Sequence, residues 1–121
     1  MLRRPFSIAT GLGAAAVLFA TQAAAHAHLV RSDPAANATV AAPAAISLTF
    51  NEKLVPAFSG FELTMVEHKM KVAVKTTISP DGQTIRGAPQ GKLMAGTYRI
   101  SWHAASADGH RMTGDVTFKV G

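Results

Sequence analysis

Residues 98–114 read Y-R-I-S-W-H-A-A-S-A-D-G-H-R-M-T-G. In the first half of this stretch, apolar residues occupy every second position: Tyr98, Ile100, Trp102 and Ala104. Side chains of an extended chain point alternately to opposite faces, so this spacing predicts a β-strand with one buried face. The strand runs into Asp108-Gly109-His110, where Asp and Gly favour a turn. We therefore expect a strand that packs Trp102 into a core and ends in a polar loop.

Similar alternating segments recur along the chain, separated by turn signals. They cover residues 46–51, 61–65, 72–76 and 116–120, with shorter runs at 29–30 and 84–86. Pro80-Asp81-Gly82 is a strong turn signal, and the Ala-rich stretch 35–43 is interpreted as a connecting loop. About seven short strands, with no convincing helix after the leader, predict an all-β protein. We expect an immunoglobulin-like antiparallel β-sandwich with Greek-key connections.

The first 25 residues are typical of a cleaved signal peptide. Arg3 and Arg4 supply its positive charge, residues 8–20 its apolar segment, and Ala23-Ala24-Ala25 a small-x-small cleavage site. The apolar segment is short for a membrane span, which argues against an uncleaved anchor. The paired arginines also resemble a twin-arginine signal, although paired basic residues are common in such leaders. We expect residues 1–25 to be removed and residues 26–121 to form one exported domain.

Cleavage at either of two positions leaves a histidine at the new N-terminus. Cutting after Ala25 exposes His26, and cutting after Ala27, which also fits small-x-small, exposes His28. A terminal histidine offers an α-amine and an imidazole in one residue. Their ordinary pKa values are about 7.7–8.0 and about 6.5, so both groups release their protons to a metal readily near neutral pH.

Composition narrows the classes of function. Removing 25 of the 121 residues leaves 96, and removing Arg3 and Arg4 lowers the formal net charge from +5 to +3. Acidic residues interleave with the lysines and there is no Arg-rich run, so we expect no nucleic-acid partner. The chain has no cysteine, so any soft metal ligand must be methionine or histidine. We find no nucleophile motif or phosphate loop, and no pairing of glutamates, Glu52 included, that suggests acid–base catalysis.

His26, Asp108 and His110 are the candidate metal ligands. In extended backbone, positions i and i+2 point the same way, so Asp108 and His110 could converge beside the sheet. Taken alone, Asp108-Gly109-His110 is more simply an ordinary turn with an exposed histidine. In a sandwich, however, the N-terminal strand can run close to the loop before the last strand, which would bring His26 to Asp108 and His110. Together they offer an amine nitrogen, two imidazoles and a carboxylate. Such a set suits Cu(II) in a tetragonal arrangement, and zinc accepts similar ligands in a tetrahedral one.

The remaining histidines and methionines are weaker candidates. His28 has three interpretations. It is a surface residue, or it binds the same metal or orients one of its ligands, or it joins the terminal amine in a flexible chelate. We rank the flexible chelate below the folded site. Met65, His68 and Met70 have side chains that suit Cu(I). Met65, however, continues a core face, and no dense methionine motif is present, so the residues argue against a Cu(I) site. His103 is expected at the surface.

Six motifs span essentially the whole chain after the leader. They are H-A-H-L (26–29), S-D-P-A-A-N-A (32–38), L-T-F-N-E (48–52), F-S-G-F-E-L-T (58–64), A-G-T-Y-R-I-S-W (95–102) and S-A-D-G-H-R-M-T-G (106–114). In combination they resemble the CopC family of periplasmic copper-binding proteins. The resemblance implies a β-sandwich that binds Cu(II) through the amine and imidazole of the N-terminal histidine and through a D-x-H loop. Those roles fall on His26, Asp108 and His110.

The resemblance also implies a biological setting. It suggests a periplasmic carrier or buffer in copper resistance and homeostasis, with an inner-membrane copper transporter of the CopD type as a partner. Family members that bind Cu(I) carry a methionine-rich loop. Here the corresponding residues 65–70 read M-V-E-H-K-M and are poor in methionine, which suggests a Cu(II)-only member.

Two other functions are consistent with the same residues. A terminal histidine chelate with a second histidine is also the copper-holding arrangement of oxidative polysaccharide monooxygenases, which use a related sandwich. Oxygen chemistry needs an open coordination position, whereas Asp108 would occupy one here. The second alternative is an interaction module in which the histidines are incidental.

Overall fold

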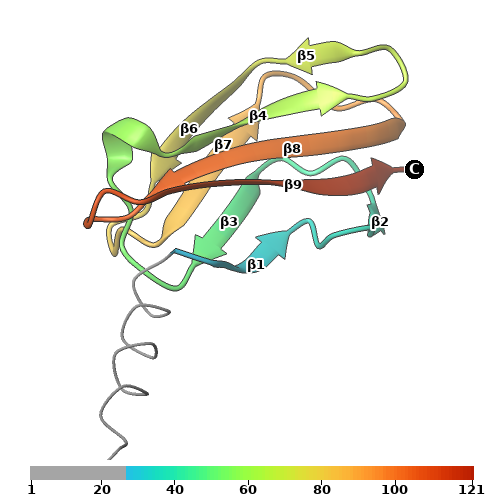
Figure 1. Cartoon of the computed structure of the whole chain (residues 1–121). Helices are drawn as coiled ribbons and strands as arrows, with labels where there is room; N and C mark the ends of the chain where they lie inside the picture. Colours follow the sequence, from blue (N-terminus) through green and yellow to red (C-terminus); the bar gives the residue numbers. More distant parts are fainter. Residues whose placement is uncertain (1–26) are drawn as a thin grey trace, which may run out of the picture.

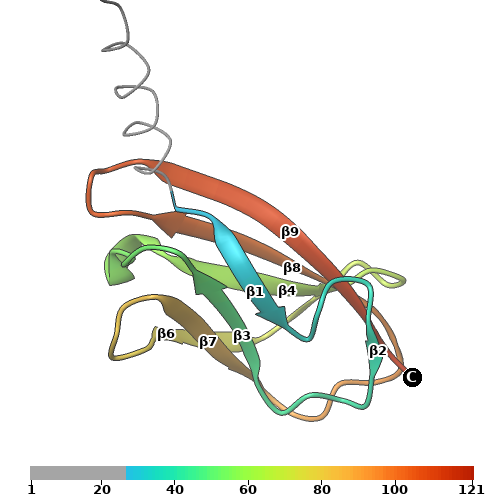
Figure 2. The same cartoon turned by 90° about the horizontal axis from the view of Figure 1, so that it is seen from below.

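The computed structural model describes residues 27–121, which form two β-sheets packed face to face (Figure 1, Figure 2). The expected signal peptide, residues 1–25, and His26 lie outside the described residues. One sheet has the strand order β1-β3-β7-β6 and the other β2-β9-β8-β4-β5. The strands are β1 (Leu29–Asp33), β2 (Thr39–Val40), β3 (Ile46–Phe50), β4 (Gly60–Met65), β5 (Met70–Val72), β6 (Val74–Ile78), β7 (Thr84–Pro89), β8 (Gly96–Ala105) and β9 (Arg111–Val120). The predicted all-β, immunoglobulin-like sandwich is confirmed.

The core lies between the sheets and follows the predicted alternation. In β8, Tyr98 and Ile100 are almost completely buried, whereas the intervening Arg99 is exposed. Trp102 packs against the core, as expected, but it is only partly buried. Its indole meets the Phe50 ring edge to face, with the ring centroids 5.1 Å apart.

Two differences from the predicted strands arise from pairing that short sequence windows do not reveal. The expected loop 35–43 contains β2, whose two residues pair in parallel with Lys119 and Val120 at the end of β9. The expected single strand 72–76 divides at Ala73, because β5 pairs with β4 in one sheet and β6 pairs with β7 in the other. Residues 27–121 therefore form nine strands rather than the expected seven or so.

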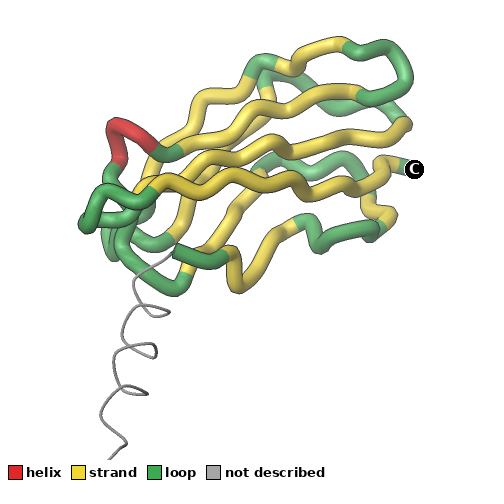
Figure 3. Tube along the Cα trace, viewed as in Figure 1, coloured by secondary structure: helices red, strands yellow, loops and turns green. Residues whose placement is uncertain are grey.

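The β8–β9 hairpin sets the two ends of the sandwich. Its strands pair without interruption from Gly96 opposite Val120 to Ala105 opposite Arg111, so the loop 106–110 projects from one end. The short 3₁₀ helix η1 (Pro56–Phe58) lies at this same end, where Figure 3 shows it in red. β4 pairs with β8 from Gly60 opposite His103 to Met65 opposite Tyr98, which puts the β4–β5 turn at the other end.

Candidate metal centre

The described chain begins at the end of the sandwich that carries the β8–β9 loop, as both cartoons show (Figure 1, Figure 2). Ala27 is only 1% exposed and belongs to the hydrophobic core. The backbone N–H of His28 donates to Asn51 Oδ1 at 2.6 Å, and the Asn51 N–H donates to the His28 carbonyl at 3.1 Å. Residues 27 and 28 are thus fixed by a buried methyl group and two hydrogen bonds.

The segment after β3 connects this anchor to the base of the loop. It leaves β3 at Asn51, and three residues later Leu54 forms an isolated antiparallel bridge with Ser106. The next residue, Val55, donates its N–H to the Ala105 carbonyl at 2.8 Å. One short segment therefore contacts both His28 and the first residues of the D-x-H loop, which holds these distant parts of the sequence at one end of the fold.

Asp108 and His110 face each other across a tight turn. His110 Nδ1 lies 2.8 Å from Asp108 Oδ2, and the His110 N–H donates to Asp108 Oδ1 at 3.1 Å. Gly109 between them has φ +90°, a left-handed conformation that glycine adopts without strain. Its N–H donates to the Ser106 carbonyl at 3.0 Å. The two side chains converge because the backbone reverses here, not because they share the face of an extended strand.

Hydrogen bonds keep the Asp108 carboxyl ionised. The Ser106 hydroxyl, then the His110 side chain and the His110 N–H, hold the pKa of Asp108 well below its usual range. The side chains of His110 and Asp108 are 55% and 36% exposed, so an ion from solvent can reach them. A carboxylate bonded to one ring nitrogen of a histidine fixes the orientation of that ring, as it does around many metal-binding histidines.

The described residues supply two candidate ligands rather than a complete site. Asp108 and His110 are brought together, as predicted, whereas His26 lies outside the described residues. Within residues 27–121 there is no group of three or more His, Asp and Glu side chains arranged to hold a metal ion. The predicted three-residue centre therefore depends on His26.

Two buried polar atoms at this end were not recognised from the sequence. Within residues 27–121, Glu52 Oε2 and Trp102 Nε1 have no hydrogen-bond partner. Glu52 lies between Asn51, which binds His28, and Leu54, which bridges to Ser106. A buried carboxylate oxygen without a donor favours a nearby cation or an added donor group. Its position directly after an alternating strand was visible in the sequence, but its burial was not.

The other histidines and methionines lie where a role in packing or at the surface, rather than in metal binding, would place them. His103 is exposed, as predicted, and His28 and His68 are also exposed. Met65 is 5% exposed within the core, whereas Met70 is 56% exposed at the surface. The turn that joins β4 and β5 lies at the end of the sandwich opposite the D-x-H loop.

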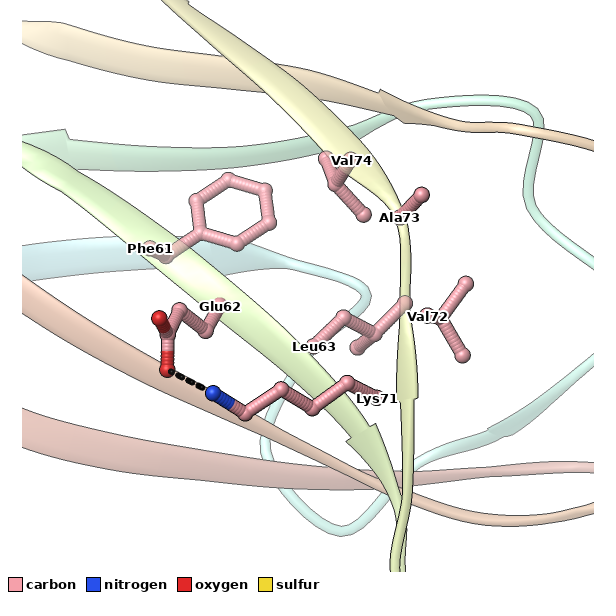
Figure 4. A pocket seen from close by; sticks show the side chains of 7 residues that line it. All are labelled: Phe61, Glu62, Leu63, Lys71, Val72, Ala73 and Val74. Carbon is pink, nitrogen blue, oxygen red and sulfur yellow. Dashed lines mark ion pairs between the residues drawn. The ribbon is translucent and has the colours of Figure 1, made fainter.

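A hollow of about 330 Å³ lies between β4 and the β5–β6 crossover (Figure 4). Its lining is mostly apolar, and its only charged side chains are Glu62 and Lys71, 3.7 Å apart. Both are largely exposed, so their ion pair contributes little. The hollow does not bring together chemically reactive groups as the D-x-H loop does.

No helix within residues 27–121 is long and apolar enough to cross a membrane.

Comparison with known proteins identifies the family. A family model described as the CopC domain matches residues 29–121. Copper resistance protein C of Xanthomonas campestris pv. juglandis is 46% identical over 112 residues, covering 88% of each chain. The crystal structure of PcoC, described as a methionine-rich copper resistance protein from Escherichia coli, superposes with a TM-score of 0.75. It is 44% identical and covers 80% of this chain and 100% of that one.

A larger relative carries the same unit. The copper transport protein CutJ of Bacillus subtilis is 36% identical over 102 residues, which are 80% of this chain but only 18% of CutJ. The names of these relatives describe copper resistance and copper transport rather than an enzymatic reaction. With a family model that spans almost all of the described residues and relatives above 40% identity, the chain belongs to the CopC family.

Proposed function

We propose that residues 26–121 form a periplasmic protein that binds one Cu(II) ion and acts as a carrier or buffer in copper resistance. The proposed ligands are the α-amine and imidazole of His26, the carboxylate of Asp108 and the imidazole of His110. One observation carries the proposal: the anchored chain start enters the fold at the end where Asp108 and His110 already face each other. His26 is one peptide bond from the buried Ala27.

The donor set and the relatives both favour copper. Three nitrogens and one carboxylate oxygen suit the tetragonal preference of Cu(II). The chain has no cysteine to offer a thiolate. Asp108 is held ionised, and the orphaned oxygen of Glu52 adds a second acceptor at this end, so the local charge fits a cation. The relatives named above are copper resistance and copper transport proteins.

The surroundings of Ala27 and His28 favour signal cleavage after Ala25. Cleavage after Ala27 would remove a side chain that is 1% exposed in the core, at a cost on the order of 1 kcal/mol for its buried methyl group. It would also turn the His28 amide, now bonded to Asn51, into the terminal amine. Cleavage after Ala25 keeps both contacts and leaves the His26 amine for the metal.

A carrier requires an acceptor, and the arrangement in CutJ suggests its class. There the unit that this chain resembles makes up 18% of a copper transport protein. We propose that the domain formed by residues 26–121 serves an inner-membrane copper transporter of the CopD type in the same way. We propose no enzymatic activity, because Asp108 would occupy a coordination position that oxygen chemistry requires to be open.

The test is a Cu(II) titration of the chain processed to begin at His26. We expect one tightly bound Cu(II) per chain and a sharp loss of affinity in His110→Ala. The matched control is His103→Ala, which removes an exposed histidine from β8 without touching the D-x-H loop. Equal affinities for His110→Ala and the unmodified chain would contradict the proposed site. Mass spectrometry of the exported protein gives the cleavage position independently.

A further inference from the structure

Ser106 is a buried polar residue at the base of the D-x-H loop. It is 0% exposed and follows directly after the last residue of β8. Its backbone N–H donates to the His110 carbonyl at 3.0 Å, and its carbonyl accepts the Gly109 N–H at 3.0 Å. These two bonds close the turn, and they do not involve the side chain. The hydroxyl is therefore available for a separate role.

The hydroxyl of Ser106 donates to Asp108 Oδ1. The same oxygen accepts the His110 N–H at 3.1 Å, so both donors act on one side of the carboxylate. The Ser106 Oγ also lies 3.5 Å from the His110 carbonyl, but its single proton is directed to the much closer Asp108. With Oδ1 held in this way, Oδ2 is the oxygen that faces the His110 ring, 2.8 Å from Nδ1.

We infer that Ser106 is a positioning residue of the metal site: its hydroxyl sets the rotation of the Asp108 carboxylate and, through it, the orientation of the His110 imidazole. The inference rests on the proposed Cu(II) site and adds to it a residue that touches no metal. Partners that orient metal ligands in this way typically change metal affinity by about 10- to 100-fold when they are removed. Without the hydroxyl, one of the two donors to Oδ1 is lost and the carboxylate can rotate away from the ring.

The experiment compares Ser106→Ala with Ser59→Ala in the chain processed to begin at His26. Ser59 is a second buried serine, 8% exposed, and its Oγ accepts the N–H of Ala105, the neighbour of Ser106. Both substitutions remove one buried hydroxyl at this end, but only Ser106 contacts Asp108. We expect Cu(II) affinity to fall about tenfold in Ser106→Ala, with altered copper hyperfine splitting in the electron paramagnetic resonance spectrum. In Ser59→Ala, affinity and spectrum should match those of the unmodified chain.

A double-mutant cycle separates positioning from a general structural effect. If Ser106 acts through Asp108, Ser106→Ala should cause no further loss of affinity in an Asp108→Ala background. Additive losses, or a Ser106→Ala spectrum identical to that of the unmodified chain, would overturn the inference and leave the copper site standing. An unmodified chain that binds no Cu(II) would instead refute the proposed function.

A measurement on the unmodified, metal-free protein covers the case in which Ser106→Ala does not fold. A buried hydroxyl bonded to a carboxylate exchanges slowly with water, so its proton should give an NMR resonance with cross-peaks to Asp108. Rapid exchange of that proton would contradict the inferred contact.

Discussion

The hydrogen bonds between Asn51 and His28 allow a quantitative prediction for Asn51→Ala. The substitution removes the Oδ1 acceptor of the His28 N–H, a 2.6 Å hydrogen bond, while the backbone bond from Asn51 N–H to the His28 carbonyl can remain. A hydrogen bond contributes about 0.5–1.5 kcal/mol net, and this one is exposed, so about 0.5–1 kcal/mol is appropriate. That energy corresponds to an equilibrium shift of about two- to fivefold.

Because the proposed site needs the chain start to be ordered, this shift should appear in Cu(II) binding. We expect the dissociation constant of Asn51→Ala to rise about two- to fivefold in a chelator competition assay. Hydrogen exchange of the His28 amide should accelerate by a similar factor. Asn51→Asp is the matched control, since it keeps the acceptor and the side-chain shape, and its affinity should not fall. Faster exchange at His28 with unchanged Cu(II) affinity would refute the link between anchoring and binding.

Three further predictions concern packing and pH. Gly114→Ala would place a Cβ 2.5 Å from Trp102 Cζ2, so urea unfolding followed by circular dichroism should show a loss of about 1–3 kcal/mol in the free energy of unfolding, reduced in a Trp102→Phe background. The pKa of Asp108 is lowered in the folded state from its ordinary value of 3.8. The ionised carboxyl should therefore stabilise the fold fully above pH 3.8, and this stabilisation should decline as the pH falls below that value. Asp108→Asn should lack this part of the pH dependence of the free energy of unfolding, measured by urea unfolding. Met65→Ala should lower stability by about 2–5 kcal/mol in the same assay, because Met65 is 5% exposed, whereas Met70→Ala, at 56% exposed, should change it little.

Residues whose environment follows local periodicity were predicted well. The alternation in residues 98–104 predicted β8, and the same reasoning separated the buried Met65 from the exposed His103. Local periodicity fails where a strand is short or changes sheet. β2 has only two residues and is held by its pairing with β9, and the run 72–76 continues its alternation across the point where the chain passes between the sheets.

In the candidate site, too, contacts that are local in sequence could be predicted, whereas contacts between distant residues could not. The proximity of Asp108 to His110 follows from their spacing in the sequence, although a turn rather than a strand brings them together. The contacts of Asn51 with His28, and of Leu54 with Ser106, join residues that are distant in sequence. No composition or spacing rule reveals such contacts, because they depend on how the sheets pack. For the same reason, the buried hydroxyl of Ser106 is not distinguishable from an ordinary turn serine until the fold is known.

The most direct test of the central claim is electron paramagnetic resonance with pulsed detection of ¹⁵N coupling on the Cu(II)-loaded chain that begins at His26. One sample carries ¹⁵N at the α-amine of His26, and the other carries ¹⁵N in the imidazole of His110. We expect each label to alter the nitrogen couplings of the same Cu(II) ion. If one Cu(II) binds per chain but its nitrogen couplings change with only one label, or with neither, the result would contradict a site shared by His26 and the D-x-H loop.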